Sequence, residues 1–329
     1  MSSDGAGMVL RVFTRALTAT AAILALATAA LATSPPSVVV TIKPLHALVA
    51  QVMAGVGSPE LLVKGAASPH TFALRPSETR LLHGAALFVR MSEALEPFTV
   101  RVVRSLPASV QVVTLQETPR LKLLGRRSAP TFERHSHARG EHSHSHSRAQ
   151  PASNTDAIDG HAWLDPDNAV AMVQRIAEIL SAKDPANAAA YADNAGALVG
   201  RLKALGDELD RDLKPIAGRP YIVFHDAYQY LERRYGLNVV GSISVSPDVP
   251  ASGKRLRELR RKITELDAVC VFAEPQIDTR LVDNLIEGTS ARPGTLDPEG
   301  VMIEAGPELY FALMRRLADD LKRCLSPPA

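Results

Sequence analysis

Short apolar runs alternate with helical patterns along most of this chain. The first half contains four runs with the length of buried strands, at residues 38–42, 60–63, 86–90 and 110–115. Between them, residues 77–83 are expected to form a helix that Ser77 caps and Gly84 ends. Similar runs return in the second half, at residues 220–224, 238–243 and 268–272. This alternation predicts an α/β fold with two lobes, each a parallel β-sheet flanked by helices.

A helical region separates the two groups of strands. Asp165-Pro166 and Asp184-Pro185 each place a capping carboxylate before a proline at the first helical position. After the second pair, leucines recur at spacings of three and four, and no proline occurs over residues 186–214. The pattern predicts one long helix of about 43 Å that joins the lobes. The expected organisation is an N-terminal lobe over 33–165, a helical region over 166–215 and a C-terminal lobe over 216–329.

The N-terminal segment has the features of a secretory signal. Arg11 and Arg15 precede an alanine-rich apolar run at residues 16–32, which ends in a small-x-small triplet. The run is short for a bilayer span and no second apolar segment follows it, so residues 1–32 are expected to be cleaved rather than to anchor the chain. The net charge is +2, without a dense basic stripe, which argues against nucleic-acid binding.

An insertion rich in Ser, Arg, Gly and His interrupts the pattern at residues 126–159. Its composition predicts a mobile segment outside the core. It contains five of the ten histidines, namely His135, His137, His142, His144 and His146. Such a tract favours weak, secondary metal binding, and a solvated spacer is the alternative.

Cys270 and Cys324 are the only cysteines. In an exported chain an isolated pair favours one disulfide, with two buried free thiols as the alternative. A cysteine metal site is disfavoured because neither residue has another Cys or a His nearby in the sequence.

Three histidines outside the tract occupy similar places. His70 lies in a loop before a predicted helix, His161 lies just before the Asp165-Pro166 helix start, and His225 directly follows a predicted strand. Parallel sheets place ligand groups in such loops beyond strand ends. His83 closes a short helix, where the helix dipole already favours it. The three histidines are therefore expected to form a metal site in the cleft between the lobes. His46 follows the first strand and is a weaker candidate for the lining of this cleft.

Several motifs in order resemble the zinc-uptake periplasmic binding proteins (ZnuA type) of the metal-binding cluster of ABC-transporter solute-binding proteins. The resemblance runs from about Val38 to the C-terminus and includes a histidine-rich insertion before the second histidine. The motifs are Ser68-Pro69-His70 with Leu74-Arg75-Pro76-Ser77 behind it, His161-Ala162-Trp163-Leu164-Asp165-Pro166, Phe224-His225-Asp226-Ala227-Tyr228, Phe272-Ala273-Glu274-Pro275-Gln276 and Gly294-Thr295-Leu296-Asp297-Pro298.

The resemblance implies a periplasmic binding protein rather than an enzyme. A monomer is the default expectation, which the resemblance does not address. The protein would bind Zn²⁺ through His70, His161 and His225 and deliver it to an inner-membrane ABC permease with its ATPase. The resemblance also implies a bridge between Cys270 and Cys324. Some relatives carry a glutamate before the first histidine, where this chain has Pro69, so the fourth ligand is open between water and Asp297.

The residue types favour zinc over other metals. Three neutral imidazoles with one weak or open position suit Zn²⁺, whereas Mn²⁺ prefers more oxygen ligands. Copper or nickel could bind such a site at least as tightly in vitro, so affinity alone does not identify the physiological ion.

Other functions share part of this evidence. A secreted zinc hydrolase would need a general base, for which Asp226 and Glu274 are candidates, although either could instead orient an imidazole. The helical His-Glu-x-x-His signature is absent. A metal-binding adhesin or a periplasmic metal chaperone would share the site and differ only in its partner.

Overall fold

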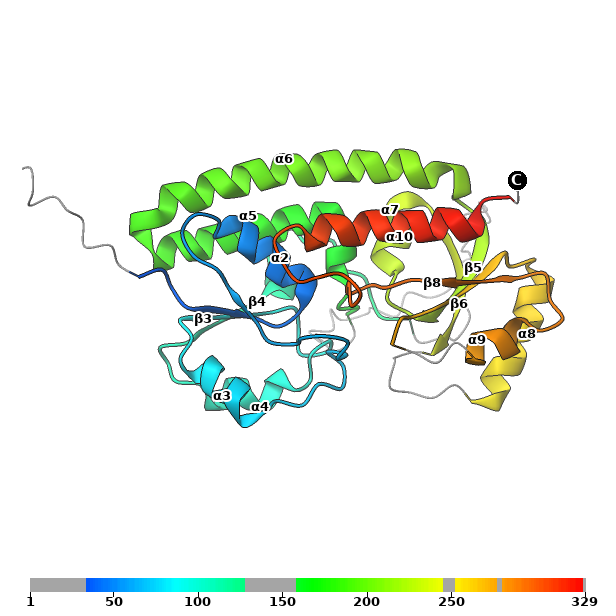
Figure 1. Cartoon of the computed structure of the whole chain (residues 1–329), viewed down its shortest axis with the longest axis horizontal. Coiled ribbons are helices and arrows are strands. Elements are labelled where there is room, and N and C mark those ends of the chain that lie inside the picture. The colour runs from blue at the N-terminus through cyan, green and yellow to red at the C-terminus, as the bar shows by residue number, and fades with distance from the viewer. Residues whose placement is uncertain (1–33, 128–157, 245–251, 277–279, 328–329) are drawn as a thin grey trace, which may run out of the picture. The chain divides into compact units, whose positions relative to one another are not determined.

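Two four-stranded parallel sheets form the framework of the protein. The computed structural model describes residues 34–127, 158–244, 252–276 and 280–327. The N-terminal sheet has the order β2 (Glu60–Leu61), β1 (Val38–Val40), β3 (Leu87–Arg90) and β4 (Gln111–Thr114). The C-terminal sheet has the order β6 (Asn238–Ser244), β5 (Pro220–His225), β7 (Cys270–Ala273) and β8 (Arg292–Thr295). Figure 1 shows both sheets flanked by helices, so the predicted fold class is confirmed.

Each sheet separates two cores, because successive side chains of a strand point to opposite faces. In β1, Val39 packs in a small cluster with residues of α3 (Pro76–His83) and α4 (Thr99–Ser105). In β5, Ile222 packs in another small cluster with residues of α8 (Gly253–Glu265) and α9 (Arg280–Ile286). Each sheet therefore has its own helices on one face.

The opposite faces of both sheets belong to one continuous core. Val38 and Val40 of β1, and Tyr221 and Val223 of β5, all lie in the same cluster of buried residues. The helices of this cluster include α2 (Lys43–Val52), α5 (Pro166–Lys183), α6 (Ala188–Leu213), α7 (Gln229–Tyr235) and α10 (Leu309–Leu325). A shared core of this kind resists movement of one sheet against the other, because its side chains are close-packed.

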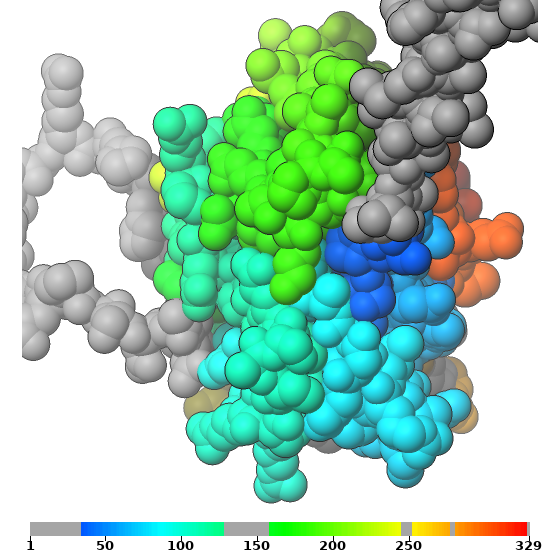
Figure 2. All heavy atoms as spheres, turned by 90° about the vertical axis from the view of Figure 1, so that its left-hand side faces the viewer, coloured from blue at the N-terminus to red at the C-terminus, as the bar shows by residue number. Residues whose placement is uncertain are grey.

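The long helix α6 is the predicted connecting helix. It has 26 residues, so it is about 39 Å long at 1.5 Å per residue. It packs against α5 and α2, and also against α10 and α7 (Figure 1). Figure 2 looks onto the left-hand side of Figure 1 and shows the green residues of the helical region above the cyan residues of the α3–α4 segment. Helical layers therefore lie on both sides of the N-terminal sheet.

Two expected helix caps are wrong in detail. Helix α3 begins at Pro76, with Arg75 as its N-cap, because proline suits the first helical position. Ser77 therefore lies inside the helix. Asp165 caps α5 as expected, by accepting a hydrogen bond from the backbone N–H of Asp167 at 2.9 Å.

Asp184 does not cap a helix as Asp165 does, because its carboxylate accepts hydrogen bonds from side chains instead of from a backbone N–H. The Tyr191 hydroxyl and the Asn187 amide donate to it at 2.9 and 2.7 Å. A short 3₁₀ turn, Pro185–Asn187, then precedes α6. The helix start is in the predicted place, but it is not capped by a carboxylate–backbone bond.

The segment between β8 and α10 returns to the helices of the N-terminal half. Lys43 at the start of α2 donates to the carbonyls of Gly300, Val301 and Ile303 at 2.9–3.1 Å. The Trp163 indole donates to the Pro298 carbonyl at 3.0 Å. These hydrogen bonds hold the segment that follows the C-terminal sheet against residues that belong to the N-terminal half.

Several expectations concern residues outside the described ranges. The signal segment, residues 1–32, and the five tract histidines are among them. Among the described residues, no helix has both the length and the apolar character needed to cross a membrane.

Candidate metal centre

The loop between β2 and α3 carries His70. Its backbone N–H donates to Ser68 Oγ at 3.3 Å, which forms a short turn. The ring is half-buried, and its Nε2 is buried without a hydrogen-bond partner. A buried imidazole nitrogen left unpaired is costly unless it binds something, so Nε2 is available for a ligand role.

His161 lies at the start of a 3₁₀ turn, Ala162–Leu164, just before α5. Its Nδ1–H donates to Asp159 Oδ1 at 2.7 Å, and its backbone N–H donates to the same oxygen at 3.1 Å. Gly160 permits this tight arrangement, because a Cβ there would lie 2.9 Å from Leu95 Cβ. Asp159 therefore sets the tautomer of His161 and leaves Nε2 with a free lone pair.

His225 is the last residue of β5 and is only 2 % exposed. Its Nδ1–H donates to Glu274, which follows the neighbouring strand β7 and is 1 % exposed. The carboxylate can only accept, so the neutral ring carries its proton on Nδ1 and its Nε2 lone pair is the one that can face a metal. Glu274, one of the two candidate bases, is thus placed as an orienting partner.

The three rings converge on one point. One ring nitrogen from each of His70, His161 and His225 lies within 4.8 Å of the other two. The Nε2 atoms of His161 and His225 are 3.4 Å apart. The ring centroids of the three pairs are 5.3–5.9 Å apart. The 3.4 Å between the Nε2 atoms of His161 and His225 suits two ligands that each lie about 2 Å from one tetrahedral ion. A nitrogen pair as far apart as 4.8 Å would have to close by a small movement of one ring to bind the same ion.

His70 and His225 differ in how readily they take up a proton. Burial, together with the charges of His161, His225 and Arg126, lowers the pKa of His70 to about 2. Burial also lowers the pKa of His225, but Glu274, through its charge and hydrogen bond, and Asp226 and Asp159, through their charges, raise it above its usual value. A cation at the cluster would replace the proton of His225, which these carboxylates favour.

Asp226, the second candidate base, has a different partner. Arg127 donates to both of its carboxylate oxygens at 2.6–3.1 Å and also binds Glu232 at 2.9 Å. Burial is the main cause that raises the pKa of Asp226, although Arg127 opposes the shift. Asp226 and Arg126 line the same recess as the three histidines, which has a volume of about 240 Å³.

The remaining sequence candidates lie elsewhere. Asp297 is not in the histidine cluster; Oδ1 accepts from the backbone N–H groups of Glu299 and Gly300, and Oδ2 accepts from that of Met302, at 2.8–3.2 Å. His46 interacts with the Pro59 carbonyl at 3.1 Å. His83 ends α3, as expected, where its Nδ1 interacts with the Thr79 carbonyl at 2.8 Å.

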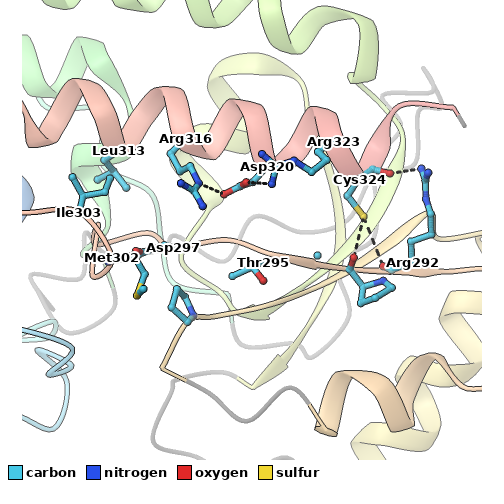
Figure 3. A pocket seen from close by; sticks show the side chains of 13 residues that line it. Arg292, Thr295, Asp297, Met302, Ile303, Leu313, Arg316, Asp320, Arg323 and Cys324 are labelled. Carbon is cyan, nitrogen blue, oxygen red and sulfur yellow. Dashed lines mark hydrogen bonds and ion pairs between the residues drawn. The ribbon is translucent and has the colours of Figure 1, made fainter. Parts of the chain in front are cut away.

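A larger recess, of about 600 Å³, lies between α10 and β8 (Figure 3). Arg316 and Arg323 of α10 flank Asp320 there, at 3.2 and 2.7 Å. Cys324 lies at one end of this recess and is bonded to Cys270 of β7, so the structure contains the expected disulfide. The recess holds none of the three convergent histidines.

The contributions of Asp159, Arg126 and Arg127 to the site are not among the features predicted from the sequence. Asp159 carries a local signal, because an aspartate two residues before a histidine can reach its Nδ1. The contact between Arg127 and Asp226 has no such signal, since 99 positions separate the two residues.

Comparison with known proteins agrees with these features. The family model described as "Zinc-uptake complex component A periplasmic" matches residues 38–324. The "High-affinity zinc uptake system protein ZnuA" of Brucella suis is 39 % identical over 305 residues, covering 88 % of this chain and 91 % of the relative. The protein of the same name from Paracoccus denitrificans is 38 % identical over 310 residues, with 88 % and 92 % coverage.

Solved structures share the fold. The Zn(II)-bound ZnuA-like domain of Streptococcus pneumoniae AdcA superposes with a TM-score of 0.68 at 22 % identity, covering 89 % of this chain and 100 % of that one. A laminin-binding adhesin of Streptococcus agalactiae gives a TM-score of 0.71 at 23 % identity, with 88 % and 100 % coverage. At such identities the likeness concerns the fold alone, whereas the family match and the Brucella and Paracoccus relatives show that the chain belongs to the ZnuA family of periplasmic zinc-uptake components.

Proposed function

We propose that this protein captures one Zn²⁺ ion in the periplasm through His70, His161 and His225 and delivers it to an ABC permease powered by an ATPase. The observation that carries the proposal is the convergence of three ring nitrogens within 4.8 Å. Carboxylates fix the orientation of two of these rings through Nδ1, which directs Nε2 toward the ion. Asp297 is left out of the proposed ligand set, because its oxygens accept backbone hydrogen bonds.

The donor set favours zinc as the transported ion. Three neutral imidazoles with one further position suit Zn²⁺, whereas Mn²⁺ prefers more oxygen ligands. Copper and nickel would bind at least as tightly in vitro. Selection in the cell would then depend on metal supply and on recognition by the permease.

Binding and release, rather than catalysis, fit the carboxylates around the site. A hydrolase would need a free base beside a metal-bound water. Glu274 binds His225, Asp159 binds His161, and Asp226 binds Arg127. We therefore assign the first two carboxylates to orientation of the ligands.

Competition with a zinc chelator tests the ligand set. His161→Ala should bind zinc at least about a hundredfold more weakly, since a structural zinc site of about 10–16 kcal/mol is shared among four ligands. The matched control is His83→Ala, which removes a histidine at a helix end outside the cluster. Both changes are made in a variant that also lacks residues 134–148, so that the tract cannot bind zinc. Unchanged affinity in His161→Ala would refute the assignment.

The histidine tract is proposed as a secondary, weaker site that raises the local zinc concentration. Calorimetric titration should then give more than one zinc for the full chain. The variant lacking residues 134–148 should retain one tight ion. Loss of that ion would show that tract histidines belong to the primary site.

A further inference from the structure

Within the described residues, no side chain joins the three histidines as a fourth ligand. Pro69 has no ligating side chain, and Asp297 is held by backbone N–H groups. Among the described residues, no Cys, Asp or Glu joins the cluster of His70, His161 and His225. Zinc bound by three imidazoles nevertheless takes a fourth ligand.

Every carboxylate in the wall of the recess is already engaged. Asp159 accepts from His161 through one oxygen and from Gln229 through the other, at 2.7 and 3.0 Å. Both oxygens of Asp226 accept from Arg127. Glu274, behind His225, accepts from His225 and from Gln276. All of these carboxylate oxygens already accept hydrogen bonds, and none of them belongs to the histidine cluster.

Arg126 is the exception among the charged residues of the wall. It lines the recess with the three histidines, is exposed, and is close enough for its charge to act on His70. Its guanidinium forms no hydrogen bond or ion pair within the part of the chain that the structure describes. An unpaired guanidinium next to a cation site is unfavourable by simple Coulomb repulsion, unless an anion lies between the two charges.

The recess also has room for such an anion. Its volume of about 240 Å³ is several times the roughly 30 Å³ that one water occupies in the liquid. The planar fork of an arginine matches the two oxygens of a carboxylate-type anion.

We propose that the ion is carried together with a small carboxylate-type anion, such as bicarbonate or acetate, that fills the fourth coordination position and is held by Arg126. The inference rests on the proposed function and assigns the fourth ligand to a group outside the chain. Arg126 is then a determinant of metal affinity that touches the anion and not the metal.

Cobalt(II) makes the fourth ligand visible, because its absorption spectrum depends on the coordinating atoms. The wild type and all variants are compared without residues 134–148, so that the tract cannot bind Co²⁺; each protein is loaded with Co²⁺ and titrated with acetate at constant ionic strength. The wild type should show a saturable spectral change. Arg126→Gln should require about tenfold more acetate, the equivalent of one charge-assisted hydrogen bond. Arg126→Lys should lie between them, since it keeps the charge and loses the fork.

Arg104→Gln is the matched control, because Arg104 is an exposed arginine of α4 that does not line the recess. It should behave like the wild type. A zinc competition titration of the same four proteins, with and without acetate, should give an acetate-dependent gain in affinity that Arg126→Gln largely loses.

Two failures can be distinguished. If Co²⁺ binds and His161→Ala abolishes its spectrum, but acetate has no effect, the anion proposal is wrong and the metal site stands. An equal response in the wild type and Arg126→Gln overturns the role of Arg126. If His161→Ala leaves the cobalt spectrum unchanged, the proposed function itself fails.

Discussion

The two sides of the histidine cluster are built differently. On the C-terminal side, His225 ends a strand, is buried, and is oriented by Glu274 from the next strand. On the N-terminal side, His70 lies in a loop, and its backbone turn with Ser68 is its one hydrogen bond among the described residues. One side is therefore preorganised by regular structure, and the other can adjust to the ion. His161 resembles His225, because Asp159 orients it.

This difference predicts that His70 and His225 contribute similarly to zinc affinity. Their contributions to the free energy of unfolding of the zinc-free protein should differ. His225→Ala removes an imidazole and leaves Glu274 buried without its partner. Zinc affinity should fall at least about a hundredfold, and the free energy of unfolding of the zinc-free protein by about 3 kcal/mol. His70→Ala should weaken zinc similarly, but change stability by less than about 1 kcal/mol.

Chelator competition and urea unfolding of the zinc-free variants measure the two effects separately. Equal destabilisation by His70→Ala and His225→Ala would show that the two sides do not differ in this way.

The next largest effect on zinc affinity is expected from removing a side chain that orients one of the ligands. Glu274→Gln keeps the shape of the side chain but loses the charge that favours the ligating tautomer of His225, so zinc affinity should fall about 10–100-fold. Ser68→Ala, the corresponding change beside His70, should alter affinity by only about twofold. Glu287→Gln, at an exposed glutamate of the same lobe, is the control for loss of charge. A larger effect from Ser68→Ala than from Glu274→Gln would reverse the comparison.

Much of the fold follows from local patterns, and the exceptions have tertiary causes. The apolar runs predict seven of the eight strands, because a strand buried on both faces is apolar throughout. Strand β8 is missed because it contains Pro293 and Gly294, which are poor strand formers. Gly294 is required by packing, since a Cβ there would lie 2.5 Å from the Phe272 ring.

The site is predictable to a similar extent. Loops after strands and before helices indicate His70, His161 and His225, which the structure brings together. The charge pattern around them is not predictable, because Arg127 meets Asp226 only after the chain has folded.

The contributions of His225 and His70, on the two sides of the histidine cluster, to the stability of the protein should change in opposite directions with pH. The folded state raises the pKa of His225 above 6.5, so the stability that its protonation contributes is present below pH 6.5 and is lost as pH rises through the raised value. Folding lowers the pKa of His70 to about 2, so this residue costs stability as pH falls below its unfolded value of about 6.5.

Urea unfolding of the zinc-free protein between pH 5 and 8 tests both signs. As pH is lowered below about 6.5, the His70→Gln variant should lose less stability than the wild type. As pH is raised above about 6.5, the His225→Gln variant should lose less stability than the wild type. As pH is lowered, the zinc affinity of the wild type should begin to decline before pH 6.5 is reached. The reason is that His225 gains a proton before His70 does. Parallel curves for both variants and the wild type would contradict the assignment of opposite shifts.

The disulfide should have the smallest effect on zinc, although it lies on the strand that supports the preorganised side. Cys270 begins β7, Glu274 follows its end, and the bridge to Cys324 closes a loop with a sequence separation of 54. Replacing both cysteines by alanine should lower the free energy of unfolding by about 4 kcal/mol, through the added entropy of the unfolded chain. Affinity should change by less than about threefold, because β7 remains paired with β5 and β8 on either side. Urea unfolding and chelator competition on the same double variant measure the two quantities. A loss of affinity above tenfold in the folded variant would mean that the bridge itself holds Glu274 against His225, and that the preorganised side depends on a covalent link rather than on the sheet.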